Sequence, residues 1–314
     1  MNTLSPSVSA AAASAARGAV PMPVQAPKVP GNPPATGPQS PLDLSTVGDL
    51  PALPAAVLEL LRLLGSDDVD PRTLAAKIAY DQALTAKTLR IANSSFYGVQ
   101  RHVTSVPDAM TVLGLRAVRA LVTAAALVGS FKPPTCQGFD FLGFWRHAIH
   151  SAVSARLVAN AIGADGEVAF TAGLLHDIGQ LVLASAFPER FAQVLARAGG
   201  DSEIALQDAE RAVLGLDHAD VGAHLTERWY FPSQIVEAIG HHHRSCAPGA
   251  VAELARIVRV SGVLAHGLEV GQIPVVAPSC AELWAGLGLA PAAWSQIAGE
   301  TAAQAQSICA ALLN

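Results

Sequence analysis

The run AGLLHDIGQLVL, residues 172–183, places an imidazole and a carboxylate in the middle of apolar residues. The apolar pattern predicts a core helix, and a carboxylate buried there is strongly destabilising unless it is paired or coordinated. Any fold that contains this run must therefore bring cationic or metal-ligating partners to the His176-Asp177 doublet. We interpret the doublet as a metal ligand, or as the support of one, rather than as a solvated pair.

The composition favours packed helices over strands. Hydrophobic residues make up 51% of the 314 residues and charged residues 14%, and much of the apolar share is alanine. Sheets call for valine, isoleucine and aromatic residues instead. No βαβ alternation, no glycine-rich phosphate loop and no repeat of fixed period is found, so we predict an all-α fold.

Apolar residues recur at helical spacing from about residue 50 onward, beginning with a stripe that includes Leu53, Val57 and Leu60. Asp70, Asp81 and Ser105 are placed to cap three further helices in the N-terminal part. A longer apolar helix is expected over 115–131. Beyond it, helices are expected at 140–161, 166–186, 188–199, 201–214, 218–229, 233–243 and 250–268, with a loop near 274–278 and short helices near 280–287 and 291–312.

Composition also divides the chain. Residues 1–44 are rich in alanine, proline and serine, and they lack the large apolar side chains needed to offset ordering entropy, which predicts a disordered tail. The Pro133-Pro134 break separates an N-terminal helical part, 45–135, from a second helical part, 136–272. Residues 273–314 form a C-terminal helical extension.

The formal net charge of −5 argues against nucleic-acid binding over the whole molecule. A basic cluster in the N-terminal part is interpreted as a solvated helix face; its members are Lys87, Arg90, Arg101, Arg116 and Arg119. The longest apolar stretch, residues 120–128, is far shorter than a membrane span requires. Four widely spaced cysteines without a CxxC pair, and no secretory signal, favour the reducing cytoplasm.

Further histidines lie on the expected helices. His147 and His150 are three residues apart in FWRHAIH, although a partly buried histidine bonded to backbone is the simpler interpretation of either one alone. The apolar stripe of the 233–243 helix continues through His242 and His243. His218 begins another helix, whose Gly222 permits close packing. No single spacing is diagnostic, but the order of the whole set is specific.

That order resembles the HD-type metal phosphohydrolase superfamily, and residues 45–270 resemble its regulatory offshoot, the HDOD family. The matching segments are LPALPAAVLELLRLL, DQALTAKTLRIANSSFYG, VTSVPDAMTVLGLRAVRALV, FWRHA, AGLLHDIGQLVL, HADVGAHL and AIGHHHR. The ANSSFYG run is what separates HDOD proteins from true HD hydrolases. The resemblance implies a multi-helix HD-like bundle preceded by a smaller N-terminal helical subdomain.

The resemblance also implies a metal site, holding one divalent ion such as Fe, Mn or Zn, with the ligands His147, His176, Asp177, His218, His242 and His243. The terminal aspartate of the superfamily aligns with Gly262, which follows Ser261 in LARIVRVSGVLAHG. The GlyTyrPro element of the HD-GYP cyclic-di-GMP phosphodiesterases is absent, since RSCAPG follows the histidines. Glu253 lies more than two turns earlier and does not replace the lost carboxylate, so the site is interpreted as degenerate.

We therefore predict a bacterial-type cytoplasmic regulatory module that binds a signalling partner, from cyclic-di-GMP or two-component pathways, with no catalytic residues and no catalysis. No kinase, receiver or cyclase segment is found, so we expect a stand-alone module that acts in trans. The alternative is a metal-dependent phosphohydrolase acting on a nucleotide or cyclic dinucleotide, in which a metal-bound water attacks phosphorus. Nucleic-acid binding or a purely structural role is the remaining alternative.

Overall fold

The computed structural model describes residues 42, 55–64, 70–94, 96–199, 203–244, 249–271 and 284–313. Across these residues every regular element is a helix, which confirms the predicted all-α class. The expected tail, 1–44, lies outside the described residues except for Leu42, whose backbone N–H donates to the Leu214 carbonyl at 2.7 Å. The expected loop near 274–278 and most of the short helix near 280–287 also lie outside them.

The N-terminal helices begin where the sequence predicts. Asp70, Asp81 and Ser105 each accept a hydrogen bond from a backbone N–H in the first turn of the following helix, as side-chain caps do. The helices of this part are α1 (Ala55–Leu64), α2 (Pro71–Tyr80), α3 (Gln82–Ala92), α4 (Val106–Leu113) and α5 (Leu115–Ser130).

The second part holds α6 (Phe141–Ala161), α7 (Gly166–Leu175), α8 (Ile178–Ala186), α9 (Pro188–Ala198), α10 (Glu203–Leu214), α11 (His218–Arg228), α12 (Ser233–His241) and α13 (Ala250–Glu269), and α15 (Pro291–Leu312) follows. Two expectations were wrong. The single helix expected over 166–186 is broken at the His176-Asp177 doublet, because Asp177 leaves helical geometry with φ −100° and ψ 6°. The last helix, expected to be short, has 22 residues.

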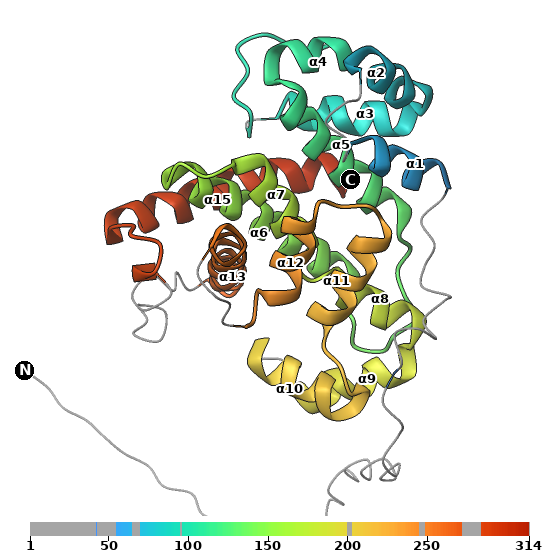
Figure 1. Cartoon of the computed structure of the whole chain (residues 1–314), viewed down its shortest axis with the longest axis vertical. Helices are drawn as coiled ribbons and strands as arrows, with labels where there is room; N and C mark the ends of the chain where they lie inside the picture. Colours follow the sequence, from blue (N-terminus) through green and yellow to red (C-terminus); the bar gives the residue numbers. More distant parts are fainter. Residues whose placement is uncertain are drawn as a thin grey trace, which may run out of the picture. The chain divides into compact units, whose positions relative to one another are not determined.

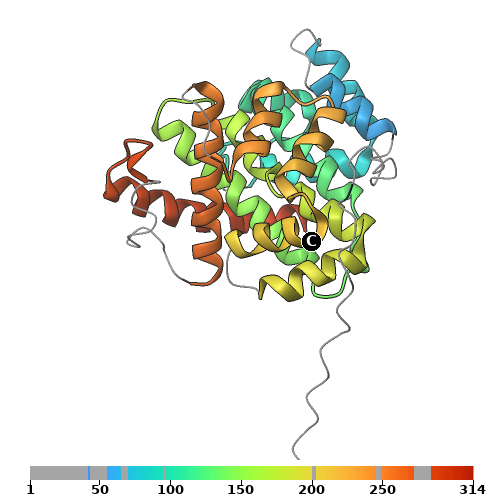
Figure 2. The ribbon, with the colours of Figure 1, turned by 60° about the horizontal axis from the view of Figure 1, so that its bottom comes forward.

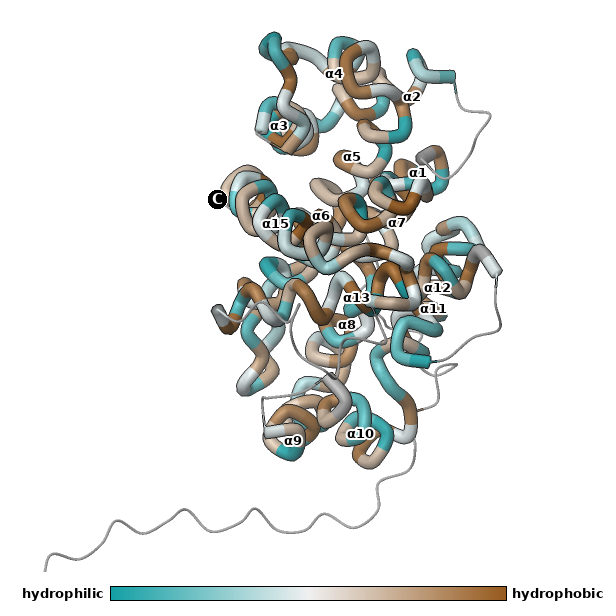
Figure 3. Tube along the Cα trace, turned by 90° about the vertical axis from the view of Figure 1, so that its left-hand side faces the viewer, coloured by the Kyte–Doolittle hydropathy of each residue, from teal (hydrophilic) through white to brown (hydrophobic). Residues whose placement is uncertain are grey.

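Helix α6 is the central element of the bundle. It packs against α7, α13 and α15 (Figure 1). Its Trp145, Ile149 and Val153 are fully buried. Helix α15 also packs against α3, so the C-terminal helix contacts both helical parts of the chain. Figure 2 shows the long α13, in orange, beside these central helices. Figure 3 shows that hydrophobic residues gather on α5, α6 and α7.

One stretch, Gly166–Ala186, is long and apolar enough by composition to cross a membrane. However, 83% of its window is buried inside the protein, and the break between α7 and α8 interrupts it. Its hydropathy is therefore explained by its place in the core of the bundle.

The ANSSFYG run joins the two helical parts. Phe96 packs on Phe170 of α7, with ring centroids 5.7 Å apart. The guanidinium of Arg156, on α6, lies 4.5 Å from the ring centroid of Phe96 and 4.7 Å from that of Tyr97. These cation–π contacts fix the turn after α3 against the second part.

Helices α8 and α11 touch through their backbones. A Cβ added at Gly179 would overlap the carbonyl oxygen of His218, and one at Gly222 would lie 3.0 Å from Cγ2 of Ile239. The close packing predicted at Gly222 is confirmed, and Gly179 makes a tighter approach that the sequence analysis did not consider. This approach brings the residue that precedes α8, Asp177, next to the start of α11.

We expect Gly179→Ala to lower the free energy of unfolding by about 1–3 kcal/mol, because the added methyl group must push α8 and α11 apart. The matched control is Gly299→Ala in α15, where an added Cβ meets nothing within 4 Å. That substitution should stabilise the helix by up to about 1 kcal/mol. Urea unfolding measures both, and equal effects of the two variants would contradict the backbone contact.

Candidate metal centre

The six residues that the sequence predicts as metal ligands converge on one point, although they come from four places in the chain. His147 lies on α6, and the His176-Asp177 doublet occupies the break between α7 and α8. His218 is the first residue of α11, and His242 and His243 directly follow α12. The predicted convergence is thus observed, while metal binding by these residues stays a prediction.

The Asp177 carboxylate lies at the centre of the cluster and is 8% exposed. Its Oδ1 is 3.2 Å from Nε2 of His218 and 3.8 Å from Nε2 of His242. On its other side, Oδ2 is 3.4 Å from Nε2 of His176 and 3.8 Å from Nε2 of His147. The two carboxylate oxygens therefore serve two separate groups of imidazoles.

These groups form two possible metal-ligand sets that share Asp177. In one set, which we call the three-histidine half, the ligand atoms of Asp177, His218, His242 and His243 lie within 4.8 Å of one another. In the other set, which we call the two-histidine half, the ligand atoms of His147, His176 and Asp177 also lie within 4.8 Å of one another. Nε2 of His218 also faces Nε2 of His243 at 2.9 Å, so a shared proton or a cation must relieve the approach of these two ring nitrogens.

Two of the imidazoles are anchored by backbone carbonyls. The Nδ1–H of His176 donates to the Gly173 carbonyl at 2.8 Å, and that of His242 donates to the Ile239 carbonyl at 2.6 Å. A proton held on Nδ1 leaves the Nε2 lone pair directed at the centre. Nε2 of His242 is buried and has no hydrogen-bond partner in the described part of the chain.

Two other imidazoles are anchored by carboxylates. The Nδ1–H of His218 donates to Glu210 Oε2 at 2.7 Å, and that of His147 donates to Glu269 Oε2 at 3.2 Å. Glu210 is fully buried on α10, and the same oxygen accepts the backbone N–H of His218 at 2.9 Å. Carboxylate–histidine pairs of this kind orient metal-ligating imidazoles and raise their basicity.

Neither glutamate was found from the sequence. A signal existed for Glu269, which follows Gly262 by seven residues, or about two turns of α13, and so lies on the same helix face. Glu210 gave no comparable signal, because its burial on α10 is seen only in the structure. Position 262 carries no carboxylate, and the adjacent Ser261 hydroxyl is buried without a hydrogen-bond partner among the described residues.

Burial and the neighbouring imidazoles set the charge of the centre. Burial would raise the pKa of Asp177, but His176 and the hydrogen bond from His218 outweigh it and hold that pKa well below its usual range. Burial, with the charge of His218, lowers the pKa of His243 to about 3, and burial also lowers the pKa of His242 and His176. Near neutral pH these three imidazoles are therefore neutral and able to bind a metal.

His218 differs from the other histidines. Burial alone would lower its pKa, but the charge of Glu210, together with hydrogen bonds to Glu210 and Asp177, raises it well above the ordinary value. In the absence of a cation the imidazolium of His218 thus offsets part of the negative charge of Asp177 and Glu210. A divalent ion would take over that role and displace the proton.

A second buried carboxylate fixes the start of α11. Asp217 has no exposed surface, and its Oδ2 accepts hydrogen bonds from Arg211 at 2.6 Å and Arg244 at 3.3 Å. Its Oδ1 accepts the backbone N–H of Asp220 at 3.0 Å. Because Arg244 directly follows His243, this contact ties the end of the histidine run to α11.

Two histidines that are close in sequence to the candidate ligands, His150 and His241, lie outside both ligand sets. His150 donates through Nδ1 to the Arg146 carbonyl at 2.8 Å, and His241 donates to the Glu237 carbonyl at 2.8 Å. His150 instead lines a cavity of about 720 Å³ that reaches His147 and Asp177. Other polar residues that line this cavity are Asp140, Arg146, Gln180, His266 and Glu269.

Comparison with known proteins gives a match to the HDOD domain model over residues 50–245. A crystal structure of a provisionally named phosphohydrolase from Shewanella amazonensis SB2B is 28% identical, with a TM-score of 0.73, over 86% of this chain and 97% of that one. A provisionally named signal transduction protein from Marinobacter aquaeolei VT8 is 26% identical, with a TM-score of 0.67, over 89% of this chain and 63% of that one.

An uncharacterized protein of Treponema pallidum (strain Nichols) is 28% identical over 199 residues, which are 63% of this chain. The matched stretch spans only 38% of that protein's length. The likeness therefore concerns one part of a longer relative.

We expect Glu210→Gln to weaken metal binding by about 10–100-fold, because His218 loses the carboxylate that orients it. Titration of metal-free protein with Zn²⁺ in a calorimeter measures the affinity. Glu300→Gln is the matched control, since Glu300 lies on α15 and its carboxylate accepts a surface hydrogen bond from Gln296. Unchanged Zn²⁺ affinity in Glu210→Gln would show that the His218 contact does not support the ligand set.

Asp217 predicts a pH-dependent contribution to stability. Burial would raise its pKa, but hydrogen bonds from the Asp220 amide and from Arg211 outweigh it and lower the pKa to about 2. A lowered carboxyl pKa stabilises the fold above the unfolded-state pKa of about 4, by roughly 2 kcal/mol, and this is lost as pH falls through 2. Asp217→Asn should therefore lower the thermal midpoint at pH 5–8, with a difference from wild type that shrinks between pH 4 and 2. A difference that stays constant down to pH 2 would contradict it.

Proposed function

The chain belongs to the HDOD domain family, and we propose that it is a signal-transduction regulatory module that binds one divalent metal ion without hydrolysing a substrate. The observation that supports this proposal most directly is that four imidazole rings are held in fixed orientations by hydrogen bonds at Nδ1. His147, His176, His218 and His242 each have an Nδ1 partner, which leaves Nε2 directed at Asp177. Such preorganisation supports a working metal site rather than a remnant, because unused imidazoles would need no fixed tautomer.

The residues of the three-histidine half fit a divalent ion. Imidazole and carboxylate donors suit Zn, Fe or Mn, and the buried Nε2 of His242 lacks a hydrogen-bond partner among the described residues. The ion would be held by Oδ1 of Asp177 with His218, His242 and His243. When bound, it would supply Lewis acidity and a lowered pKa for a coordinated water.

The small number of carboxylates in the two-histidine half is the reason to propose that the protein does not hydrolyse a substrate. A pair of divalent ions needs several anionic ligands, and Asp177 is the only carboxylate in either ligand set of the described residues. Glycine at 262 removes the anion that the superfamily places there. Glu269 contacts Nδ1 of His147, the ring nitrogen that faces away from Asp177, so it orients this imidazole rather than adding a ligand.

A metal-dependent phosphohydrolase is the second candidate function. It is favoured by the cavity of about 720 Å³ beside His147 and Asp177, whose lining includes two further histidines, His150 and His266, and Arg146, which is paired with Asp140 at 3.6 Å. An anionic phosphate ester could enter such a cavity. The Shewanella structure, which is similar to this chain, is named a phosphohydrolase, and this name supports the second candidate function.

The regulatory role would be exerted on a signalling partner in the cytoplasm, such as a component of a cyclic-di-GMP or two-component pathway. The HDOD match and the name of the Marinobacter structure, a signal transduction protein, support a signalling role of this general kind. A metal ion would then stabilise the helix ends that meet at Asp177, and so hold the surface that the partner contacts.

Metal analysis of protein purified without a histidine tag tests the binding part of the proposal. We expect about one Zn, Fe or Mn ion per chain, and loss of that ion in His242→Ala, because the three-histidine half loses a ligand. His150→Ala is the matched control, since His150 lines the cavity but lies outside both ligand sets. Metal-free wild-type protein that also fails to take up these ions would contradict the proposal.

Hydrolysis assays separate the two candidate functions. We expect no turnover of cyclic di-GMP or bis-p-nitrophenyl phosphate by the wild type with Mn²⁺ or Fe²⁺, because the two-histidine half lacks its second carboxylate. The comparison is Gly262→Asp, assayed for metal content and turnover alongside the wild type. Metal-dependent turnover by the wild type that His176→Ala abolishes would establish the phosphohydrolase instead.

A further inference from the structure

Helix α10 lies at the edge of the bundle, yet one of its side chains reaches the metal centre. Helix α9 is the main helix that α10 packs against, and α9 in turn packs against α8. Figures 1 and 3 both show α9 and α10 at the lower edge of the molecule. From this position the carboxylate of Glu210 contacts His218, a candidate ligand. A peripheral helix is thus connected directly to the centre.

The inner side of α10 is only partly packed against other helices. Leu206 of α10, with Leu195 and Ala198 of α9, lines the cavity of about 720 Å³ beside the metal centre. Of the larger apolar side chains of α10, Leu214 is buried, whereas Leu206 and Val213 are half-buried. A helix that borders a cavity gains less from apolar burial than a core helix does. Its polar contacts therefore matter more for holding it in place.

The most buried of these polar contacts is made by Glu210, which has no exposed surface. Its Oε2 accepts the Nδ1–H of His218 at 2.7 Å and the backbone N–H of the same residue at 2.9 Å. Its Oε1 is buried without a hydrogen-bond partner among the described residues. A carboxylate in such a place is stable only while nearby positive charge compensates it. That charge can reach Glu210 through His218 and through any cation that His218 binds.

Two further side chains of α10 contact the start of α11, and both bind Asp217 rather than a candidate ligand. Nη2 of Arg211 donates to Asp217 Oδ2 at 2.6 Å, and Nε2 of Gln207 donates to the same oxygen at 3.0 Å. Arg244 adds a second guanidinium at 3.3 Å. The charge of Asp217 is therefore compensated by arginines whether or not an ion is bound. The Glu210 contact is the part of the α10 attachment that an ion can change.

We propose that α10 is a metal-responsive element and that Glu210 senses the ion: α10 opens from the bundle more often when the three-histidine half is empty than when it is occupied. An ion bound at Nε2 of His218 adds positive charge across the same imidazole ring that contacts Glu210. This charge favours the buried carboxylate. Without the ion, opening of α10 returns an incompletely compensated carboxylate to water. The inference rests on the proposed function and names the surface, that of α10, through which metal occupancy would act.

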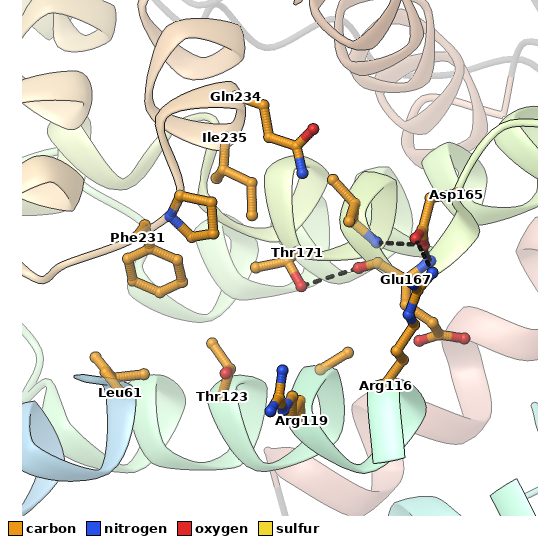
Figure 4. Close-up of a pocket in the computed structure, with 13 residues that line it drawn as sticks. Leu61, Arg116, Arg119, Thr123, Asp165, Glu167, Thr171, Phe231, Gln234 and Ile235 are labelled. Carbon is orange, nitrogen blue, oxygen red and sulfur yellow. Dashed lines mark hydrogen bonds and ion pairs between the residues drawn. The ribbon is translucent and has the colours of Figure 1, made fainter. Parts of the chain in front are cut away.

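Helix α1 is a suitable internal reference, because it is a helix of similar length that lies away from the metal centre. Figure 4 shows its Leu61 at one end of a second cavity, of about 290 Å³, whose lining also comes from α5, α7 and α12. This cavity shares no lining residue with the cavity beside the metal centre. Local opening of α1 should therefore be independent of an ion at Asp177.

Amide hydrogen exchange of the full-length chain, followed by mass spectrometry, tests the inference. The protein is purified without a histidine tag, stripped of metal with a chelator, and compared with and without saturating Zn²⁺. We expect the amides of α10, 203–214, to exchange about tenfold more slowly with Zn²⁺, as a hydrogen bond to a charged group would give. The amides of α1, 55–64, should exchange equally in both samples. Calorimetry on the same samples measures whether Zn²⁺ binds.

Two variants of α10 separate sensing by Glu210 from a general stabilisation of the protein by Zn²⁺. Glu210→Gln keeps an acceptor oxygen for His218 but has no charge, so exchange of its α10 amides should no longer depend on Zn²⁺ at concentrations that saturate the variant. Asp208→Asn is the matched control, because Asp208 is an exposed carboxylate on the same helix. It should keep the wild-type response. Circular dichroism checks that both variants are helical.

The outcomes distinguish this inference from the metal-binding proposal. Zn²⁺ binding by the wild type without a change in α10 exchange would overturn the inference and leave metal binding standing. Absence of Zn²⁺ binding would overturn both. A Zn²⁺ response of α10 that persists in Glu210→Gln would also overturn the inference, because Glu210 would then not be the sensing group. The wild-type comparison alone decides the matter if Glu210→Gln does not fold.

Discussion

The burial of the Asp177 carboxylate among imidazoles is the interaction on which the rest of the structure depends. An ionised carboxylate cannot stay in a helical core without compensation. The chain supplies this compensation by bringing the ends of α7 and α12 and the start of α11 to one point, where each contributes at least one histidine, and α6 adds His147 from its interior. The break between α7 and α8, and the backbone contact at Gly179, are the local geometry that this convergence requires.

A second layer of contacts keeps the imidazoles in place. Glu210 and Glu269 hold two of them, and backbone carbonyls hold two more. Under the proposed function, glycine at position 262 stands where the resemblance implies an aspartate, and its effect would be to remove one possible ligand without loosening the remaining rings. We propose that a centre with fewer anionic ligands but well-oriented imidazoles uses a metal for structure or regulation rather than for turnover.

Much of the fold could be predicted from the sequence, because caps and apolar periodicity are local signals. Asp70, Asp81 and Ser105 start the helices that they predict. The convergence of the six candidate ligands was also predicted, through the family resemblance that the order of the histidines carries. The sequence could not give the break at Asp177, since its apolar flanks continue a helical pattern across the doublet. Glu210 was missed because its partner, His218, is brought to it by tertiary packing.

X-ray absorption spectroscopy of Zn²⁺-loaded protein tests the central claim, that one ion is held by the three-histidine half. The account predicts a single Zn environment with imidazole nitrogens at about 2.0–2.1 Å and a carboxylate oxygen at about 2.0–2.2 Å. The imidazole signal should be reduced in His243→Ala. A Zn environment dominated by water or sulfur, or one unchanged in that variant, would contradict the account.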